Sequence, residues 1–297
     1  MMGIISLVLN GWVILKGIQI PLDWAYLFIL SLSMLMGAID TKLTCMAYVM
    51  PTLFIVDETL VLTGLKSHYF NLAYTEMIIL VGALHCIEGL LTFAYGGKRH
   101  SAIMTYRGKK AAGGYQAYGK WFIPLLFFSV QGIYIPLIAV VIYLNESFVF
   151  SPKSKSKIVG AWILMYGLSI MGLGYLTYLG KIPLLFSMLS MTILHELLFS
   201  IDTYIEQGEL LYPYPKQGIR VMELEEKYLR KDKIKIEKGD IILKVNGELI
   251  QTEEAYLKAI QEGNVKLTLK KISGALIQVE YTKKELKSMA LVFLPPL

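Results

Sequence analysis

Charged residues and cysteines are scarce in this sequence. Only 18% of its 297 residues are charged, and it has 2 cysteines and 4 histidines. So few cysteines exclude a disulfide-rich scaffold, and 55% hydrophobic residues exclude a disordered chain. Soluble domains carry about 25% charged and about 45–50% apolar residues. The chain is too apolar for one soluble domain, which predicts that much of it lies in a membrane.

Long apolar stretches account for this excess. About 20 residues of helix cross the hydrocarbon core of a bilayer. The sequence therefore predicts a polytopic α-helical membrane domain over residues 1–205, with six or seven spans. The expected spans are 3–20, 23–39, 44–64, 73–96, 121–144, 158–179 and 182–204. Gly160, Gly167 and Gly174 recur every seven residues, which predicts the close approach of a neighbouring helix.

Basic residues leave the orientation of these spans undecided. They are nearly balanced between the two sides, so the positive-inside rule favours neither. The net charge of +6 does not indicate nucleic-acid binding, because loops of membrane proteins are rich in Lys and Arg. The basic run 98–120 is expected to be a solvated loop that touches anionic lipid headgroups. Cys45 and Cys86 lack the spacing of a disulfide or redox pair, and no metal or cofactor is expected.

Residues beyond 205 have the mixed charge and alternating hydrophobicity of a small soluble domain. Gly and Pro residues predict a linker over 206–215, and the domain itself is expected over 216–297. Its expected strands are 218–224, 241–245, 265–272 and 275–281.

Turn and cap residues separate these strands. Lys238-Gly239-Asp240 is expected to form a turn, and Asn246-Gly247 suits a tight turn that needs positive φ. Thr252 is followed by two glutamates and is expected to cap a helix, because its hydroxyl accepts a hydrogen bond from a free amide of the first turn.

This order of elements resembles the PDZ domains attached to bacterial membrane and periplasmic proteases. The resemblance rests mainly on the core GDIILKVNGELI, residues 239–250. It implies a small α/β domain that binds an extended peptide beside a sheet edge. The expected groove residues are Gly218, Ile219, Arg220, Val221, Tyr256 and Ile260. A closed domain that packs only on its own membrane part is the alternative.

Part of a zinc-protease motif occurs in the last apolar stretch. Site-2-type proteases bind zinc with two histidines four residues apart and use the glutamate between them as a base. His195 and Glu196 match the first half, but Phe199 replaces the second histidine and cannot bind zinc. The sequence therefore predicts no enzyme. The alternatives are a catalytically silent site-2-protease-like regulator of membrane proteolysis and a transporter.

Several ionisable residues lie within the apolar stretches. A charge at the bilayer centre costs about 2.5–3.5 kcal/mol, so such groups normally face the bundle interior and pair. The sequence predicts an intramembrane polar lock made of His195, Glu196, Asp202, His85 and Glu88. A proton or transport path is the alternative; its residues would be Asp57, Glu58, Glu76, Glu88 and His195.

Three pieces of sequence together resemble MinJ-like membrane proteins of Gram-positive-type bacteria. They are Gly113-Gly114-Tyr115-Gln116 followed by Trp121-Phe122-Ile123-Pro124, then Leu194-His195-Glu196, then GIRVMEL, KGDIILKVNGELI, AYLKAI and the end Met289–Leu297. The resemblance implies a multi-pass cell-membrane protein that holds its PDZ domain in the cytoplasm. It also implies a non-enzymatic scaffold that recruits the Min inhibitor of cell division through polar scaffold proteins.

Overall fold

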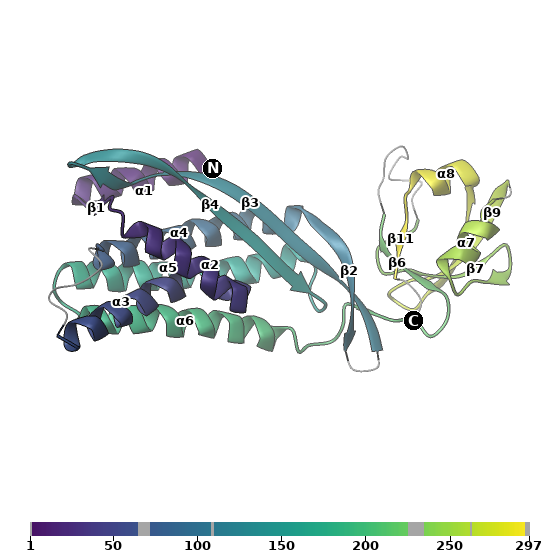
Figure 1. The fold of residues 1–297 in the computed structure, drawn as a ribbon. Helices are drawn as coiled ribbons and strands as arrows, with labels where there is room; N and C mark the ends of the chain where they lie inside the picture. Colours follow the sequence, from purple (N-terminus) through teal and green to yellow (C-terminus); the bar gives the residue numbers. More distant parts are fainter. Residues whose placement is uncertain (1, 65–71, 108–109, 225–234, 262, 295–297) are drawn as a thin grey trace. The chain divides into compact units, whose positions relative to one another are not determined.

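The computed structural model describes residues 2–64, 72–107, 110–224, 235–261 and 263–294. They divide into two compact units, each built from several segments of the chain. The helical unit comprises residues 1–99, 118–144 and 153–205, and the C-terminal unit comprises 100–117, 145–152 and 206–297. Figure 1 shows the elements of both units.

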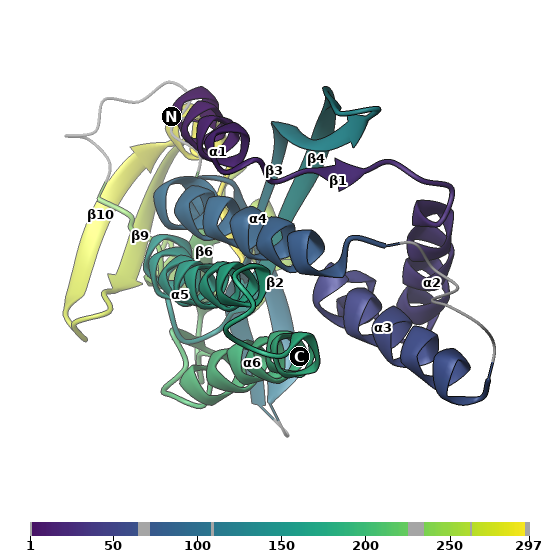
Figure 2. The same cartoon turned by 90° about the vertical axis from the view of Figure 1, so that its left-hand side faces the viewer.

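Six α-helices form most of the helical unit. They are α1 (Met2–Lys16), α2 (Tyr26–Ile39), α3 (Met46–Leu62), α4 (Tyr74–Tyr95), α5 (Pro152–Tyr178) and α6 (Leu184–Ile205). The short 3-10 helices η1 (Thr41–Thr44) and η2 (Gly96–Lys98) precede α3 and follow α4. Figures 1 and 2 show α4, α5 and α6 lying side by side.

Glycines bring α4 and α5 into backbone contact. A Cβ atom on Gly160 would collide with the backbone of Phe93, and one on Gly167 with the backbone of Cys86. Gly82 and Gly89 on α4 meet α5 in the same way. The predicted close approach is confirmed, since small residues let two helix backbones touch.

Only part of the predicted membrane domain forms long helices. Among the described residues, three helices are long and apolar enough to cross a membrane: 74–98, 152–178 and 184–205. The helices in the first three predicted spans have 15, 14 and 17 residues, and α3 also contains Pro51, Asp57 and Glu58. The prediction of six or seven spans is therefore wrong, because a helix needs about 20 residues to cross.

The predicted span 121–144 is a β-hairpin. Strands β3 (Lys110–Val130) and β4 (Ile133–Ser147) pair, and β1 (Ile20–Pro21) adds to β3 in parallel. The hairpin turns at Gln131 and Gly132, whose φ angles of 51° and 80° suit the tight two-residue turn. Pro124 and Pro136 would each break a helix. Both faces of the hairpin are apolar, so the sequence shows no alternation that would indicate strands.

The basic run 98–120 is not a loop. Its residues form β2 (His100–Arg107) and the first half of β3, which pair antiparallel from His100 with Ala117 to Arg107 with Lys110.

A six-stranded sheet forms the core of the C-terminal unit. Its order is β10-β9-β7-β6-β11, with β8 paired to β7. The strands are β6 (Ile219–Glu223), β7 (Ile241–Val245), β8 (Glu248–Leu249), β9 (Asn264–Lys270), β10 (Leu276–Thr282) and β11 (Val292–Phe293). Helices α7 (Glu253–Ala259) and α8 (Lys283–Ser288) complete it.

The expected turns and cap of this unit are confirmed. Asn246 and Gly247 link β7 to β8 with φ angles of 52° and 91°. The Thr252 side chain accepts a hydrogen bond from the Ala255 amide at 3.1 Å and caps α7. Lys238 and Gly239 form the turn before β7.

The C-terminal elements do not form the small separate PDZ domain that the sequence predicts. They share their unit with residues 100–117 and 145–152, and β5 (Tyr212–Pro213) pairs with β3. The Tyr115 hydroxyl donates to the Met222 carbonyl at 2.9 Å, and His100 meets Glu223 at 3.2 Å. The predicted fold class is therefore wrong: the described chain contains eight α-helices, of which three are candidate spans, and two sheets.

Candidate functional site

Two histidines and a cysteine meet between three helices of the helical unit. Cys45 is the N-cap of α3, His85 lies on α4 and His195 on α6. One ligand atom from each lies within 4.8 Å of the other two. The histidines are 8% and 7% exposed. We call these three residues the His–Cys cluster.

Hydrogen bonds orient the His85 ring. Its Nδ1 lies 2.8 Å from the Val81 carbonyl oxygen, which can only accept, so Nδ1 carries the proton. Nε2 then keeps its lone pair, and it faces the Cys45 Sγ at 3.6 Å. The geometry presents an unprotonated nitrogen to a thiol.

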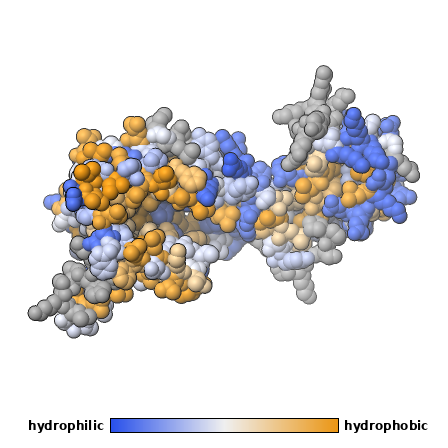
Figure 3. All heavy atoms as spheres, turned by 45° about the horizontal axis from the view of Figure 1, so that its top comes forward, coloured by the Kyte–Doolittle hydropathy of each residue, from blue (hydrophilic) through white to orange (hydrophobic). Residues whose placement is uncertain are grey.

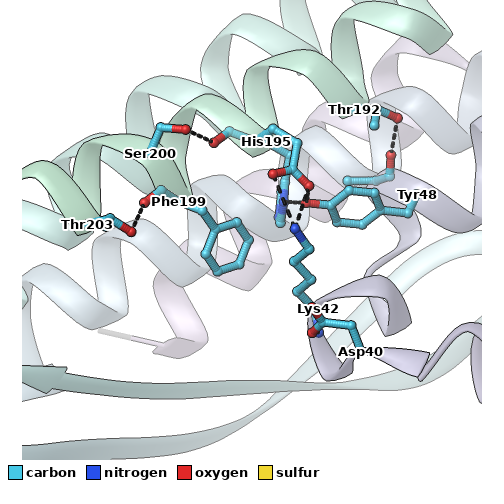
Figure 4. Close-up of polar contacts among 10 residues, drawn as sticks. Asp40, Lys42, Tyr48, Thr192, His195, Phe199, Ser200 and Thr203 are labelled. Atoms are coloured by element: carbon cyan, nitrogen blue, oxygen red, sulfur yellow. Dashed lines mark hydrogen bonds and ion pairs between the residues drawn. The ribbon is translucent and has the colours of Figure 1, made fainter. Parts of the chain in front are cut away.

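A chain of polar contacts orients the His195 ring from the other side (Figure 4). Lys42 contacts the Glu196 carboxylate at 2.9 Å, and the Tyr48 hydroxyl donates to the same carboxylate at 2.9 Å. Because Tyr48 has given its only proton to Glu196, its oxygen accepts from His195 Nδ1 at 3.0 Å. His195 Nε2 is therefore the unprotonated nitrogen.

Aromatic rings enclose the two imidazoles. The Tyr166 ring centroid lies 4.9 Å from that of His85 and 5.3 Å from that of His195. The Tyr166 hydroxyl is bound to the Met191 carbonyl at 3.0 Å. The Phe199 ring, which holds the position of the second histidine of the zinc-protease motif, lies 5.3 Å from the His195 ring and is tilted by 58° to it.

The residues of the predicted polar lock separate into two places. His85, His195 and Glu196 lie in or beside the His–Cys cluster. Asp202 instead pairs with Lys155 of α5 at 2.7 Å, and the Lys155 side chain is 2% exposed. Glu88 lies one turn after His85 on α4, half-buried.

Sequence reasoning missed three partners of this site. Cys45, Lys42 and Tyr48 come from the region around η1 and the start of α3, about 40 residues before His85 and about 150 before His195. No spacing rule links such distant positions. The available signal was chemical: a cysteine and two histidines occur in apolar stretches where polar groups are costly.

The residues predicted to line a peptide groove lie in the C-terminal unit, where β6 has a strand on both of its edges. One edge of β6 pairs with β7 through Ile219 and Arg220. Its other edge pairs antiparallel with β11, where Phe293 faces Val221, and the Leu294 amide donates to the Arg220 carbonyl at 2.9 Å. Gly218, which precedes β6, has a φ of 83°.

The side chains around Phe293 are closely packed. The Tyr256 and Phe293 ring centroids are 4.8 Å apart, and Tyr256 and Ile260 are 2% and 3% exposed. Arg220 Nη1 donates to the Gly239 carbonyl at 2.7 Å, and burial lowers the pKa of its guanidinium. Burial also raises the pKa of the Tyr256 hydroxyl.

A basic pocket occupies one end of α4 in the helical unit. Its lining combines cations and aromatic rings from α4, η2 and β3: Tyr95, Lys98, Arg99, Tyr118, Gly119, Lys120 and Trp121. The Lys98 ammonium lies 4.3 Å from the Tyr95 ring centroid. Such a lining, with three cationic side chains, attracts anions.

No protein-family model, no curated protein and no solved structure matches this chain.

Proposed function

We propose that the protein is a membrane-anchored, non-enzymatic adaptor whose C-terminal unit captures an extended apolar segment of a partner protein. The observation that carries this proposal is the chain's own segment Val292–Leu294. It lies antiparallel on β6 and inserts Phe293 beside Tyr256. Strand addition with a side-chain pocket is a recurring mode of peptide recognition.

The occupied groove indicates what kind of peptide fits. Phe293 is 6% exposed, whereas Val292 is 45% exposed. A partner segment therefore needs a large apolar side chain at the Phe293 position and tolerates a polar one at the Val292 position. The main chain of such a partner segment would pair with Val221 and Arg220, as Phe293 and Leu294 do in this chain.

A partner peptide would compete with the chain's own segment Val292–Leu294, and this competition would set the apparent affinity of the peptide. A segment tethered by a short linker has an effective concentration in the millimolar range. A free peptide of the same sequence binds the intact chain weakly for that reason, and a variant without the segment binds it much more tightly. A partner displaces the segment when its own affinity or its local concentration is high enough.

A peptide-binding titration tests the proposal. Full chain and a variant truncated after Ser288 are purified in detergent and titrated with a fluorescent peptide of residues 289–297. We expect the truncated chain to bind at least tenfold more tightly. Peptides with Phe293→Asp and Val292→Lys are the matched pair: the first should lose binding and the second should keep it. A truncated chain that stays folded by circular dichroism and binds neither peptide contradicts the proposal.

Localisation and partner class belong to the same proposal. We infer a multi-pass cell-membrane protein with its C-terminal unit in the cytoplasm, recruiting cell-division proteins. Three candidate spans support the membrane part, and the MinJ-like motifs suggest the rest. A membrane-impermeant thiol reagent applied to Lys287→Cys in a Cys45→Ser/Cys86→Ser background reports the side. Labelling of intact cells contradicts a cytoplasmic location, and a crosslinked pull-down without division proteins contradicts the partner class.

A further inference from the structure

We propose that Cys45, His85 and His195 bind one zinc ion. The inference is independent of the adaptor function, because it concerns the helical unit and not the groove. Thiolate and imidazole are the ligands that zinc prefers, and three protein ligands with one open position are a common zinc arrangement. One ligand atom from each of the three side chains lies within 4.8 Å of the other two, between α3, α4 and α6.

The distances suit the ion. Zinc–sulfur and zinc–nitrogen bonds of about 2.3 Å and about 2.0–2.1 Å place sulfur and nitrogen about 3.6 Å apart in a tetrahedral site. Cys45 Sγ and His85 Nε2 are 3.6 Å apart. The His195 nitrogen lies within 4.8 Å of both, so a small movement of one ring closes the site.

Hydrogen bonds fix the tautomer of both imidazoles. Val81 holds the proton on Nδ1 of His85, and Tyr48 holds it on Nδ1 of His195. Each Nε2 is left as the donor atom. Metal-bound histidines characteristically donate their other N–H to a carbonyl, carboxylate or comparable acceptor, which fixes the ring.

Zinc binding releases one proton, which comes from the Cys45 thiol. The Cys45 S–H bond breaks, the proton goes to solvent, and the thiolate binds the ion together with the two neutral imidazoles. Water or an external ligand takes the fourth position. The Glu196 carboxylate is bound by Lys42 and Tyr48 and is not itself a ligand. Because the three ligands come from α4, α6 and the N-cap of α3, a bound ion would link these elements.

Metal analysis of the purified full chain is the first test. After zinc loading and removal of excess ion, we expect one zinc per chain in detergent. Cys45→Ser and His195→Gln should each lower the zinc affinity at least 100-fold in competition with a chelator. Cys86→Ser is the matched control, since Cys86 neighbours His85 in sequence but lies outside the cluster, and it should keep wild-type affinity.

Further variants separate a metal site from a packing defect. Cys45→His should restore zinc binding, because imidazole replaces thiolate as a ligand. Cobalt should give a sulfur-to-metal charge-transfer band in the wild type and none in Cys45→His. Tyr48→Phe removes the hydrogen bond that orients His195 and should weaken zinc about 10-fold.

Two results overturn the proposal. The first is a wild-type chain that binds no zinc, which leaves a thiol–imidazole hydrogen bond only. The second is a Cys45→Ser variant that melts at the wild-type temperature and still binds zinc with wild-type affinity. Peptide titration of the same variants reports the adaptor function separately, so failure of one proposal is distinguishable from failure of the other.

Discussion

The two units distribute polar and apolar residues in opposite ways. In the C-terminal unit, apolar side chains form a closed core and the charged side chains lie mostly outside. In the helical unit, large apolar side chains face outward, among them Leu7, Met34, Ile138 and Ile193, each at least 65% exposed. Figure 3 shows this contrast as hydrophobic residues over the surface of the helical unit and hydrophilic residues over the C-terminal unit.

Polar contacts accompany an apolar core between the helices, where Met50, Ile78 and Leu91 are fully buried. The His–Cys cluster and the Lys155 side chain are buried in the helical unit, whereas the side chains of Lys42 and Glu196 are 33% and 45% exposed. Only 28% and 22% of the apolar windows of α5 and α6 are buried, against 67% for α4. Apolar surfaces that face outward suit lipid, and polar groups that face inward avoid it. The helical unit therefore exposes more apolar surface than the C-terminal unit does.

The largest effect is expected from a bulky side chain placed in the close contact between α4 and α5. Gly167→Leu places a side chain against the backbone of Cys86, so we expect α5 to separate from α4 and the folded yield to collapse. Size-exclusion profile and helical circular dichroism in detergent measure the effect. Gly172→Leu is the control on the same helix, because nothing lies within 4 Å of its added Cβ. Equal yields for both variants would show that glycine contacts do not hold these helices together.

The next test concerns the charge pair. Asp202→Ala removes a partner of Lys155, whose side chain is 2% exposed, and loss of one partner of a buried pair costs about 3–5 kcal/mol. The double variant Lys155→Met/Asp202→Leu should return to within about 1 kcal/mol of the wild type, since apolar replacements of a buried pair are often neutral. Unfolding in lipid–detergent mixtures measures both. An Asp202→Ala variant as stable as the wild type would show that this charge pair does not stabilise the helical unit.

A smaller effect is expected at a helix cap of the C-terminal unit. Thr252→Ala removes the acceptor for the Ala255 amide and should cost about 1 kcal/mol. Thr252→Ser keeps the hydroxyl and should be nearly neutral. Denaturant unfolding of the full chain followed by circular dichroism reports the difference. Identical midpoints for the two variants would show that the cap contributes nothing measurable.

The smallest effect is expected at Tyr256. Its hydroxyl is buried and has no hydrogen-bond partner among the described residues. Tyr256→Phe removes that polar atom and keeps the ring against Phe293, so stability should stay equal or rise by up to about 1 kcal/mol. The thermal midpoint measures it. A clear loss of stability would mean that the hydroxyl makes a contact in solution, which would sharpen the description of the groove.

Local sequence signals were sufficient for the C-terminal strands and turns. Asn246-Gly247, Thr252 and the apolar strand 241–245 each specify an element through nearby residues alone. The heptad of glycines on α5 likewise indicated close packing. These features depend on neighbours in sequence, so the amino acids themselves carry the information.

The prediction of membrane spans was wrong for several apolar stretches. A uniformly apolar sequence shows no periodicity that would distinguish a helix from a strand. Residues 121–144 are almost uniformly apolar, and both a membrane helix and an apolar β-hairpin satisfy that pattern. The turn at Gln131-Gly132 and the two prolines favoured strands, but length alone indicated a span. The first three stretches proved too short as helices to cross.

The sequence by itself determined the strongly apolar character of residues 1–205 and the local turns and caps. It also showed that the zinc-protease motif at His195 and Glu196 lacks its second histidine. Only the tertiary structure decided which polar groups meet. Cys45, His85 and His195 come from three helices far apart in the chain, and the partner of β6 is the chain's own C-terminal segment. Contacts of this kind depend on how distant segments pack, and no local pattern of residues records them.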